Sequence, residues 1–278
     1  MKSGISSFLQ AVSLVDRSNI RLDRGTVVLH LVSDEESHGH QGTGFLADKN
    51  MIRGDAAIVG EPTDLELVTS QKGALWLRIS TKGKSAHGSR PHAGINAIEK
   101  MKKAIDQLRS ISLEEEHPLL GKPTFNIGTI QGGTKINIVP ERCEIELDRR
   151  MLPGEEKEQI LREIREAFDS VQLQDPLFQY EIEEIAFAEP SEINPDDEIV
   201  KVGAEAIKEV RGKKPRIRGF SGFTDSRFYI KEFRIPALIL GPGGTDQSHT
   251  TNESVEVDAL AQAAQIYGLI ILRYLSGC

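Results

Sequence analysis

The apolar pattern of the strands changes twice along this chain, and this change constrains the fold more than any other feature. Near the start of the chain, the short runs 26–32 and 55–60 are almost continuously apolar, which is typical of parallel strands buried on both faces. Residues 74–81 instead alternate apolar and polar side chains, which is typical of an antiparallel strand with one wet face. We therefore expect an α/β region that is interrupted by an α+β insertion.

This interruption predicts two domains. One is discontinuous and covers 1–70 and 188–278, and the other covers 71–187. Helical periodicity and strand patterns also predict the following elements: helices at 3–16, 95–108, 155–168, 196–210 and 258–275, and strands at 26–32, 55–60, 74–81, 124–130, 141–147, 178–187 and 235–240.

Composition excludes several classes of function. The 278 residues carry a net charge of −8, which argues against phosphate-based binding of nucleic acid and against an anionic membrane surface. The two cysteines, Cys143 and Cys278, cannot form a disulfide framework or a cysteine-rich zinc site, so we expect a cytoplasmic protein. No apolar run in the sequence is long enough to cross a bilayer.

Two adjacent carboxylates follow the predicted strand at 26–32. Glu35 and Glu36 lie in Ser33-Asp34-Glu35-Glu36, at the carboxyl end of that strand, where open α/β sheets hold their ligands. Neighbouring like charges raise the pKa of each other unless a cation or an acid–base role compensates them. One carboxylate as a metal ligand and the other as a general base would explain the pair. A solvated acidic turn is the alternative.

Two further candidate ligands follow other predicted strands. Glu61 comes after 55–60, and His249 lies in a glycine-rich loop that follows 235–240. Together with Glu36 they would lie at three strand ends of one sheet, and mixed carboxylate and imidazole ligands suit zinc, cobalt or manganese. Either residue could instead be an ordinary surface residue.

The insertion carries candidate substrate-binding groups. His87, or less favourably His92, could donate a hydrogen bond to an oxyanion. Asn137, which follows Gly132-Gly133, and Arg150 are candidate substrate-binding residues, and the Arg150 guanidinium could bind a carboxylate with two hydrogen bonds. The alternatives are an exposed turn histidine, a turn asparagine and a solvated basic pair.

In their order along the chain, these motifs resemble those of the di-zinc aminoacylase and deacetylase family, which includes acetylornithine deacetylase, succinyl-diaminopimelate desuccinylase and the carboxypeptidase G type. The motifs are Asp34-Glu35-Glu36, Gly60-Glu61-Pro62-Thr63, Gly83-Lys84-Ser85-Ala86-His87-Gly88, Asn137-Ile138-Val139-Pro140, Asp148-Arg149-Arg150, Thr224-Asp225 and the segment 241–249. Each motif is weak alone, but seven in the correct order over nearly the whole chain are specific.

The resemblance implies a zinc-exopeptidase-like catalytic domain with an inserted ferredoxin-like α+β domain that acts as a lid and dimerises. It implies hydrolysis of a small N-acyl amino acid by a homodimer. The implied roles are Glu35 as general base, Glu36 and His249 as ligands of one metal, Glu61 as ligand of the other, His87 as oxyanion donor across the dimer, and Asn137, Arg150, Gly222 and Thr224 as substrate-binding residues.

The start of the chain departs from the family pattern. Family members carry a metal-ligating His-x-Asp motif and then a bridging Asp before Met-Lys-Gly-Gly, whereas this sequence begins Met1-Lys2-Ser3-Gly4. His38 and His40 follow the wrong strand to replace them. We therefore expect a catalytic domain that is incomplete at its N-terminus, holds at most one metal and has little activity. The alternative functions are a non-catalytic relic that serves as a dimerisation or binding module, and a di- or tripeptidase of the same family.

Overall fold

The computed structural model describes residues 2–18, 20, 25–248 and 250–276. The chain forms two compact units, one made of Met1–Lys72 with Ser191–Cys278 and the other of Gly73–Pro190. None of the helices in these described ranges is long and apolar enough to cross a membrane. Each unit is described here by itself.

The first unit is built on a mixed sheet in the order β1-β9-β2-β7, with β8 also paired to β2. Its strands are β1 (Ala57–Val59), β2 (Leu67–Gln71), β7 (Ser191–Glu192), β8 (Ile217–Phe220) and β9 (Ala237–Ile239). β1 and β9 run parallel, with Val59 opposite Ile239. Because parallel strands end at the same edge of the sheet, Glu61 and Gly241 lie just past two neighbouring strand ends, as expected from the sequence.

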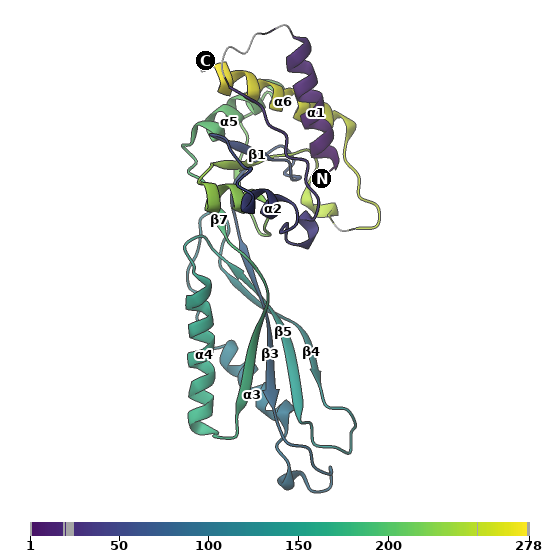
Figure 1. Cartoon of the computed structure of the whole chain (residues 1–278), viewed down its shortest axis with the longest axis vertical. Helices are drawn as coiled ribbons and strands as arrows, with labels where there is room; N and C mark the ends of the chain where they lie inside the picture. The colour runs from purple at the N-terminus through teal and green to yellow at the C-terminus, as the bar shows by residue number, and fades with distance from the viewer. Residues whose placement is uncertain (1, 19, 21–24, 249, 277–278) are drawn as a thin grey trace. The chain divides into compact units, whose positions relative to one another are not determined.

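The α-helices of this unit in the described ranges are α1 (Lys2–Arg17), α2 (Thr43–Asp48), α5 (Glu198–Arg211) and α6 (Val257–Ser276). α1 and α6 lie side by side (Figure 1), and the Phe8 and Tyr267 rings stack with their centroids 4.1 Å apart. The Tyr267 hydroxyl donates to the carbonyl of Leu240 at 2.6 Å, just beyond β9. The ring contact joins α1 to α6, and the hydrogen bond joins α6 to the end of β9. The loops at the strand ends are therefore available to form a site.

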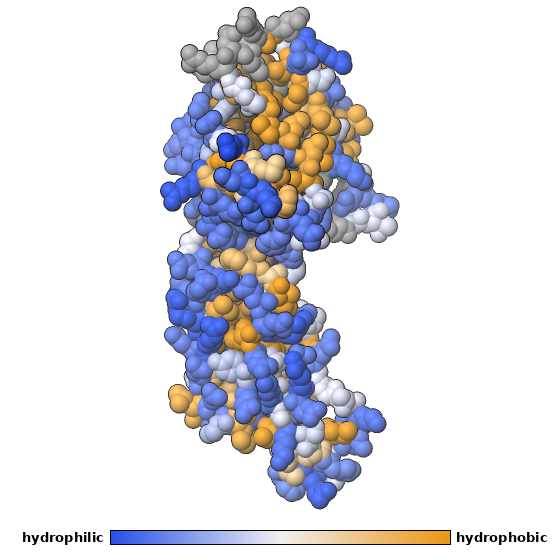
Figure 2. All heavy atoms as spheres, viewed as in Figure 1, coloured by the Kyte–Doolittle hydropathy of each residue, from blue (hydrophilic) through white to orange (hydrophobic). Residues whose placement is uncertain are grey.

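The structure contradicts the buried strand that we predicted at 26–32. In the part of the chain that the structure describes, this segment belongs to no strand, and Val28 and Leu31 are 59% and 55% exposed. It lines a cavity of about 260 Å³ together with residues of α1, α6 and 53–58, in a region where apolar side chains reach the surface (Figure 2). β-Branched residues favour strands, but a strand also needs a hydrogen-bonded neighbour, which the segment's own sequence does not reveal.

The second unit contains an antiparallel sheet in the order β4-β5-β3-β6. Its elements are β3 (Gly73–Lys82), α3 (Ala97–Leu108), β4 (Thr124–Gly132), β5 (Arg142–Met151), α4 (Lys157–Gln174) and β6 (Gln179–Ala188). The register between β3 and β5 is continuous from Gly73 opposite Met151 to Lys82 opposite Arg142. All the helices and strands predicted within the insertion are confirmed, with ends shifted by up to several residues.

The core of this unit forms where α3 and α4 pack on the sheet. It joins the apolar side chains of β3 and β5 to those of the two helices, including Leu75, Leu77, Ile79, Met101, Ile145, Leu147, Ile164 and Phe168. Asn96 caps α3, because its side-chain oxygen accepts from the backbone N–H of Ile98 at 2.9 Å. The alternating pattern in the sequence therefore corresponds to one buried face of the sheet.

Asp175 ties the two helices together at the end of α4. It accepts from Lys100 Nζ at 2.5 Å and from Lys103 Nζ at 2.7 Å. These hydrogen bonds lower the pKa of Asp175 to about 2. Because this pKa lies below its usual value, the stabilisation is present above about pH 4 and is lost as the pH falls towards 2.

We predict that Asp175→Asn lowers the free energy of unfolding of the second unit by about 1–2 kcal/mol at pH 7, because it removes charge-assisted hydrogen bonds. The difference from the wild type should shrink below pH 3. Urea unfolding followed by Trp76 fluorescence measures it, since Trp76, the single tryptophan, lies on β3. Asp106→Asn, in the exposed pair with Lys102, is the matched control and should change little. Equal losses in both variants would contradict the prediction.

Candidate metal centre and active site

Four carboxylates of the first unit gather at one place. Glu35 and Glu36 lie on a short 3₁₀ helix, Glu35–Ser37, Glu61 follows β1, and Asp225 follows β8. Glu61 and Asp225 are only 9% and 5% exposed. Glu36 contributes here although the predicted strand before it is absent, so its position depends on contacts of the turn itself.

Burial and repulsion from neighbouring carboxylates raise the pKa values of Glu35, Glu61 and Asp225. Burial, followed by the charge of Glu35, raises the pKa of Glu61 to about 8. Burial, followed by the charges of Asp225 and Glu36, raises the pKa of Glu35 to about 7. The pKa of Asp225 is also raised by burial, although a hydrogen bond from Thr43 and the charge of Arg227 oppose this. A carboxyl group with a pKa near 7 can accept and return a proton at neutral pH.

The turn that carries Glu35 and Glu36 has an unusual backbone. Asp34 and His38, at its two ends, both have left-handed φ values of 73° and 74°. The carbonyl of Asp34 accepts from the backbone N–H of Gly39 at 2.8 Å, and Gly39 also has a positive φ. A Cβ atom on Gly39 would collide with Asp225 Oδ1. Glycine therefore allows this turn to approach the loop that carries Asp225.

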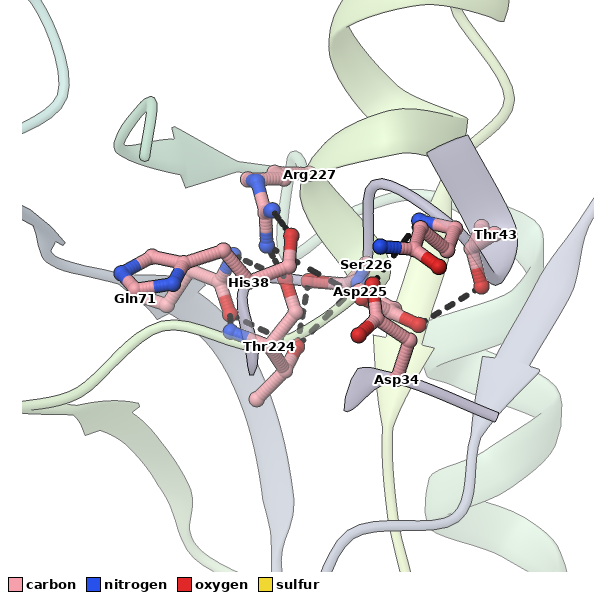
Figure 3. Close-up of polar contacts among 9 residues, drawn as sticks. Asp34, His38, Thr43, Gln71, Thr224, Asp225, Ser226 and Arg227 are labelled. Carbon is pink, nitrogen blue, oxygen red and sulfur yellow. Dashed lines mark hydrogen bonds and ion pairs between the residues drawn. The ribbon is translucent and has the colours of Figure 1, made fainter. Parts of the chain in front are cut away.

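A buried hydrogen-bond network fixes the Asp225 loop. Gln71, at the end of β2, accepts from the backbone N–H and the hydroxyl of Thr224 at 2.9 and 2.8 Å, and its amide donates to the Thr224 carbonyl at 3.2 Å. On the other side, the hydroxyl of Thr43 donates to Asp225 Oδ2 at 2.6 Å. Figure 3 shows Gln71, Thr43 and the 224–227 segment meeting in this way.

The donor chemistry of the cluster fits a divalent cation. Glu61 Oε1 and Asp225 Oδ1 are buried and accept no hydrogen bond from any residue that the structure describes. A bound cation would compensate both atoms and reduce the repulsion between the carboxylates. Nevertheless, no three His, Cys, Asp or Glu side chains within the described ranges are arranged to hold a metal ion. His249, the predicted imidazole ligand, lies outside the described residues.

Two of the predicted residues in the second unit lie together. His87 pairs with Ile138 in an isolated bridge, and the N–H of Gly88 donates to the carbonyl of Asn137 at 2.8 Å. The exposed His87 accepts from the backbone N–H of Ser89 at Nδ1, at 3.2 Å, and the same nitrogen lies 2.8 Å from the Ser89 hydroxyl. A neutral ring with its proton on Nε2 satisfies both contacts and leaves Nε2–H as a donor.

Arg150 lies elsewhere in the same unit. It stands opposite Ala74 at one end of β5, whereas Asn137 precedes the other end. Its Nη2 donates to Asp148 Oδ2 at 2.9 Å. In the first unit, Gly222 is half-buried and Thr224 is 1% exposed within the Gln71 network. The structure thus groups Glu35, Glu36 and Glu61, groups His87 with Asn137, and separates Asn137 from Arg150.

Several residues of the site were not predicted as site residues. Asp34, Thr43, Gln71, Asp225 and Arg227 all contact it. Two of them stood in motifs of the sequence, Asp34 in Asp34-Glu35-Glu36 and Asp225 in Thr224-Asp225. Thr43, Gln71 and Arg227 have no periodicity or spacing that distinguishes them from ordinary surface residues.

Comparison with known proteins identifies the class. A model described as the Peptidase dimerisation domain of M20 enzymes matches residues 69–176. The chain is 30% identical to acetylornithine deacetylase from Pectobacterium carotovorum, over 99% of this chain and 70% of that protein. The corresponding protein of Photorhabdus laumondii is 29% identical, over 98% and 69% of the two chains.

Solved structures agree. Aminopeptidase PepT from Bacillus cereus has a TM-score of 0.82 and 27% identity, over 97% of this chain and 69% of that one. The M20 family metallo-carboxypeptidase Sso-CP2 from Sulfolobus solfataricus has a TM-score of 0.76 and 19% identity, over 99% and 76% of the two chains. Fold and relatives define a metal-dependent hydrolase. The chain belongs to the M20 family of metallopeptidases.

We predict that Thr43→Val destabilises the first unit by about 1–3 kcal/mol, because it leaves a buried carboxylate without its donor. Hydrogen exchange of peptides that cover α2 and the 222–229 loop should become faster. Thr129→Val is the matched control, since Thr129 makes only an exposed contact of 3.4 Å with Glu146. Unchanged hydrogen exchange around α2 in Thr43→Val would show that the hydrogen bond from Thr43 to Asp225 does not stabilise the first unit.

Proposed function

We propose that this chain hydrolyses the amide bond of a small N-acyl amino acid, in the manner of an acetylornithine deacetylase or a succinyl-diaminopimelate desuccinylase. The observation that carries the proposal is the pair of buried carboxylates Glu61 and Asp225, with the half-buried Glu35 and the exposed Glu36 near them, in a member of a hydrolase family. The identity of 30% to an acetylornithine deacetylase over 99% of the chain supports the acyl amino acid as substrate.

Glu36, Glu61 and His249 would hold the metal, for which we propose zinc, with cobalt or manganese as substitutes. When bound, such an ion polarises the substrate carbonyl and acidifies water. Glu35 takes a proton from the attacking water and delivers it to the leaving amine. We propose at most one zinc per chain, because Glu36, Glu61 and His249 are too few ligands for two zinc ions.

The remaining roles belong to substrate and oxyanion contacts. His87 donates from Nε2 to the tetrahedral oxyanion, and we propose that it serves the site of a second copy of the chain. Asn137, Arg150, Gly222 and Thr224 are proposed to hold the substrate.

A di- or tripeptidase is the second candidate. It is favoured by the likeness to aminopeptidase PepT over 97% of the chain. Peptidase substrates carry a free α-amine where N-acyl amino acids carry an acyl group. Turnover of N-acetylornithine and N-succinyl-diaminopimelate should therefore be compared with that of a tripeptide. A non-catalytic module would bind little zinc and turn over none of them.

We predict that Glu35→Gln and Glu36→Gln separate catalysis from metal binding. Glu35→Gln should retain zinc and lower the rate by about 10²–10⁴-fold, because it removes the base and not a ligand. Glu36→Gln should lower zinc affinity by more than about 100-fold as well, since loss of a ligand costs more than loss of its supporting contacts. Zinc titration and kinetics measure both effects.

The control is Glu166→Gln on the exposed face of α4, which should change neither quantity. Equal loss of zinc in the two test variants would contradict the division of roles between Glu35 and Glu36. A wild-type chain that binds zinc but turns over only the tripeptide would support the second candidate.

We also propose that the second unit forms a homodimer through the free edge of β4 beside α3, as its dimerisation-domain relatives suggest. Gly132 of β4 lies against Ile98 of α3, and Ile98 and Ile130 are 41% and 57% exposed. An unpaired strand edge with exposed apolar side chains favours a partner.

We therefore predict that Ile130→Lys converts a micromolar dimer to a monomer in light scattering, because a charge on the edge opposes pairing. Ile185→Lys is the matched control on β6 at the opposite edge of the sheet, where Ile185 is 41% exposed. A monomeric wild-type chain, or dissociation caused by the control instead, would rule out this interface.

A further inference from the structure

A buried arginine joins the two segments that carry the site. Arg227 is 5% exposed, and its Nη1 donates to the carbonyl of Thr224 at 3.1 Å. Its Nη2 donates to the carbonyl of His38. Nη1 also lies 3.9 Å from Asp225 Oδ1. One guanidinium therefore contacts both His38, which directly follows Glu35–Ser37, and the Thr224–Asp225 loop (Figure 3).

Two aromatic rings lie against the Arg227 guanidinium. Its central carbon lies 4.2 Å from the centre of the Phe228 ring and 5.4 Å from that of Phe223. The His38 ring stacks on Phe223 with centroids 5.6 Å apart. His38 is thus held twice, through its carbonyl by Arg227 and through its ring by Phe223. Buried cation–π contacts of this kind are stronger than exposed ones.

The Glu35–Ser37 turn depends on such an anchor. Asp34 and His38 have left-handed backbones, which are unfavourable for residues with a Cβ atom. The segment before the turn, 26–32, belongs to no strand among the described residues, so no ladder fixes it. The contacts of His38 with Arg227 and Phe223 oppose the loss of this conformation.

We propose that Arg227 is a positioning residue that fixes the Glu35–Ser37 turn against the Thr224–Asp225 loop and thereby sets where the base Glu35 and the ligand Glu36 lie. This inference rests on the proposed function for those two roles. A lysine would replace it only in part, because a single ammonium keeps the charge but lacks the planar set of donors that reaches two carbonyls and stacks on aromatic rings.

The experiment compares Arg227→Met and Arg227→Lys with the wild type by hydrogen exchange, zinc titration and kinetics. In Arg227→Met, amides of 34–42 should exchange at least about tenfold faster, because two charge-assisted hydrogen bonds are lost. Zinc affinity should fall by about 10–100-fold, and kcat should fall more than KM rises. Arg227→Lys should give smaller changes in the same direction. If Arg227→Met does not fold, Phe223→Leu tests the same anchor.

Arg149→Met is the matched control, because Arg149 is also buried, ion-paired with Glu155 and placed over the Phe125 ring, but lies in the second unit. It should leave exchange in 34–42 and zinc affinity unchanged. Unaltered exchange in the variants of Arg227 or of Phe223 would overturn the proposal, and so would faster exchange with unaltered zinc affinity. A wild type without turnover would refute the proposed function, whereas the exchange and zinc results would still decide the role of Arg227.

Discussion

Repulsion between neighbouring carboxylates is the constraint that the first unit must satisfy. Charges removed from water repel more strongly than exposed ones, so the buried Glu61 and Asp225 and the half-buried Glu35 are costly to place near one another and near Glu36 unless cations or donors compensate them. Thr43 and Arg227 compensate part of this cost. We propose that the chain keeps these carboxylates together because a metal and a general base act there.

The surrounding structure is arranged to bring these carboxylates together. The parallel pair of β1 and β9 places Glu61 beside the segment that starts at Gly241. Gln71 on β2 fixes the loop of Asp225 through three hydrogen bonds to Thr224. The Glu35–Ser37 turn belongs to no strand and reaches the cluster through its contacts with Arg227 and Phe223. The least regular segment is therefore the one that carries the proposed base.

The second unit is organised differently from the first. Its antiparallel sheet and two helices bury a continuous apolar core, so this unit has a core of its own. It can therefore present groups such as His87 and Asn137 on an exposed surface while leaving the β4 edge open. Under the proposed function, a dimerising unit that also supplies an oxyanion donor makes catalysis depend on assembly, because His87 lies outside the unit that carries Glu35, Glu36 and Glu61.

The amino-acid sequence by itself determined the elements whose residues pack against near neighbours or follow a simple period. These include the strands and helices of the second unit, the helices α1, α5 and α6, and the positions of Glu36 and Glu61 as candidate ligands. It did not determine the state of 26–32, because strand formation depends on a pairing partner. It also did not reveal Thr43 and Asp225, which are 182 residues apart yet share a hydrogen bond. Polar residues are usually exposed, so only the tertiary structure decided which of them were buried around the site.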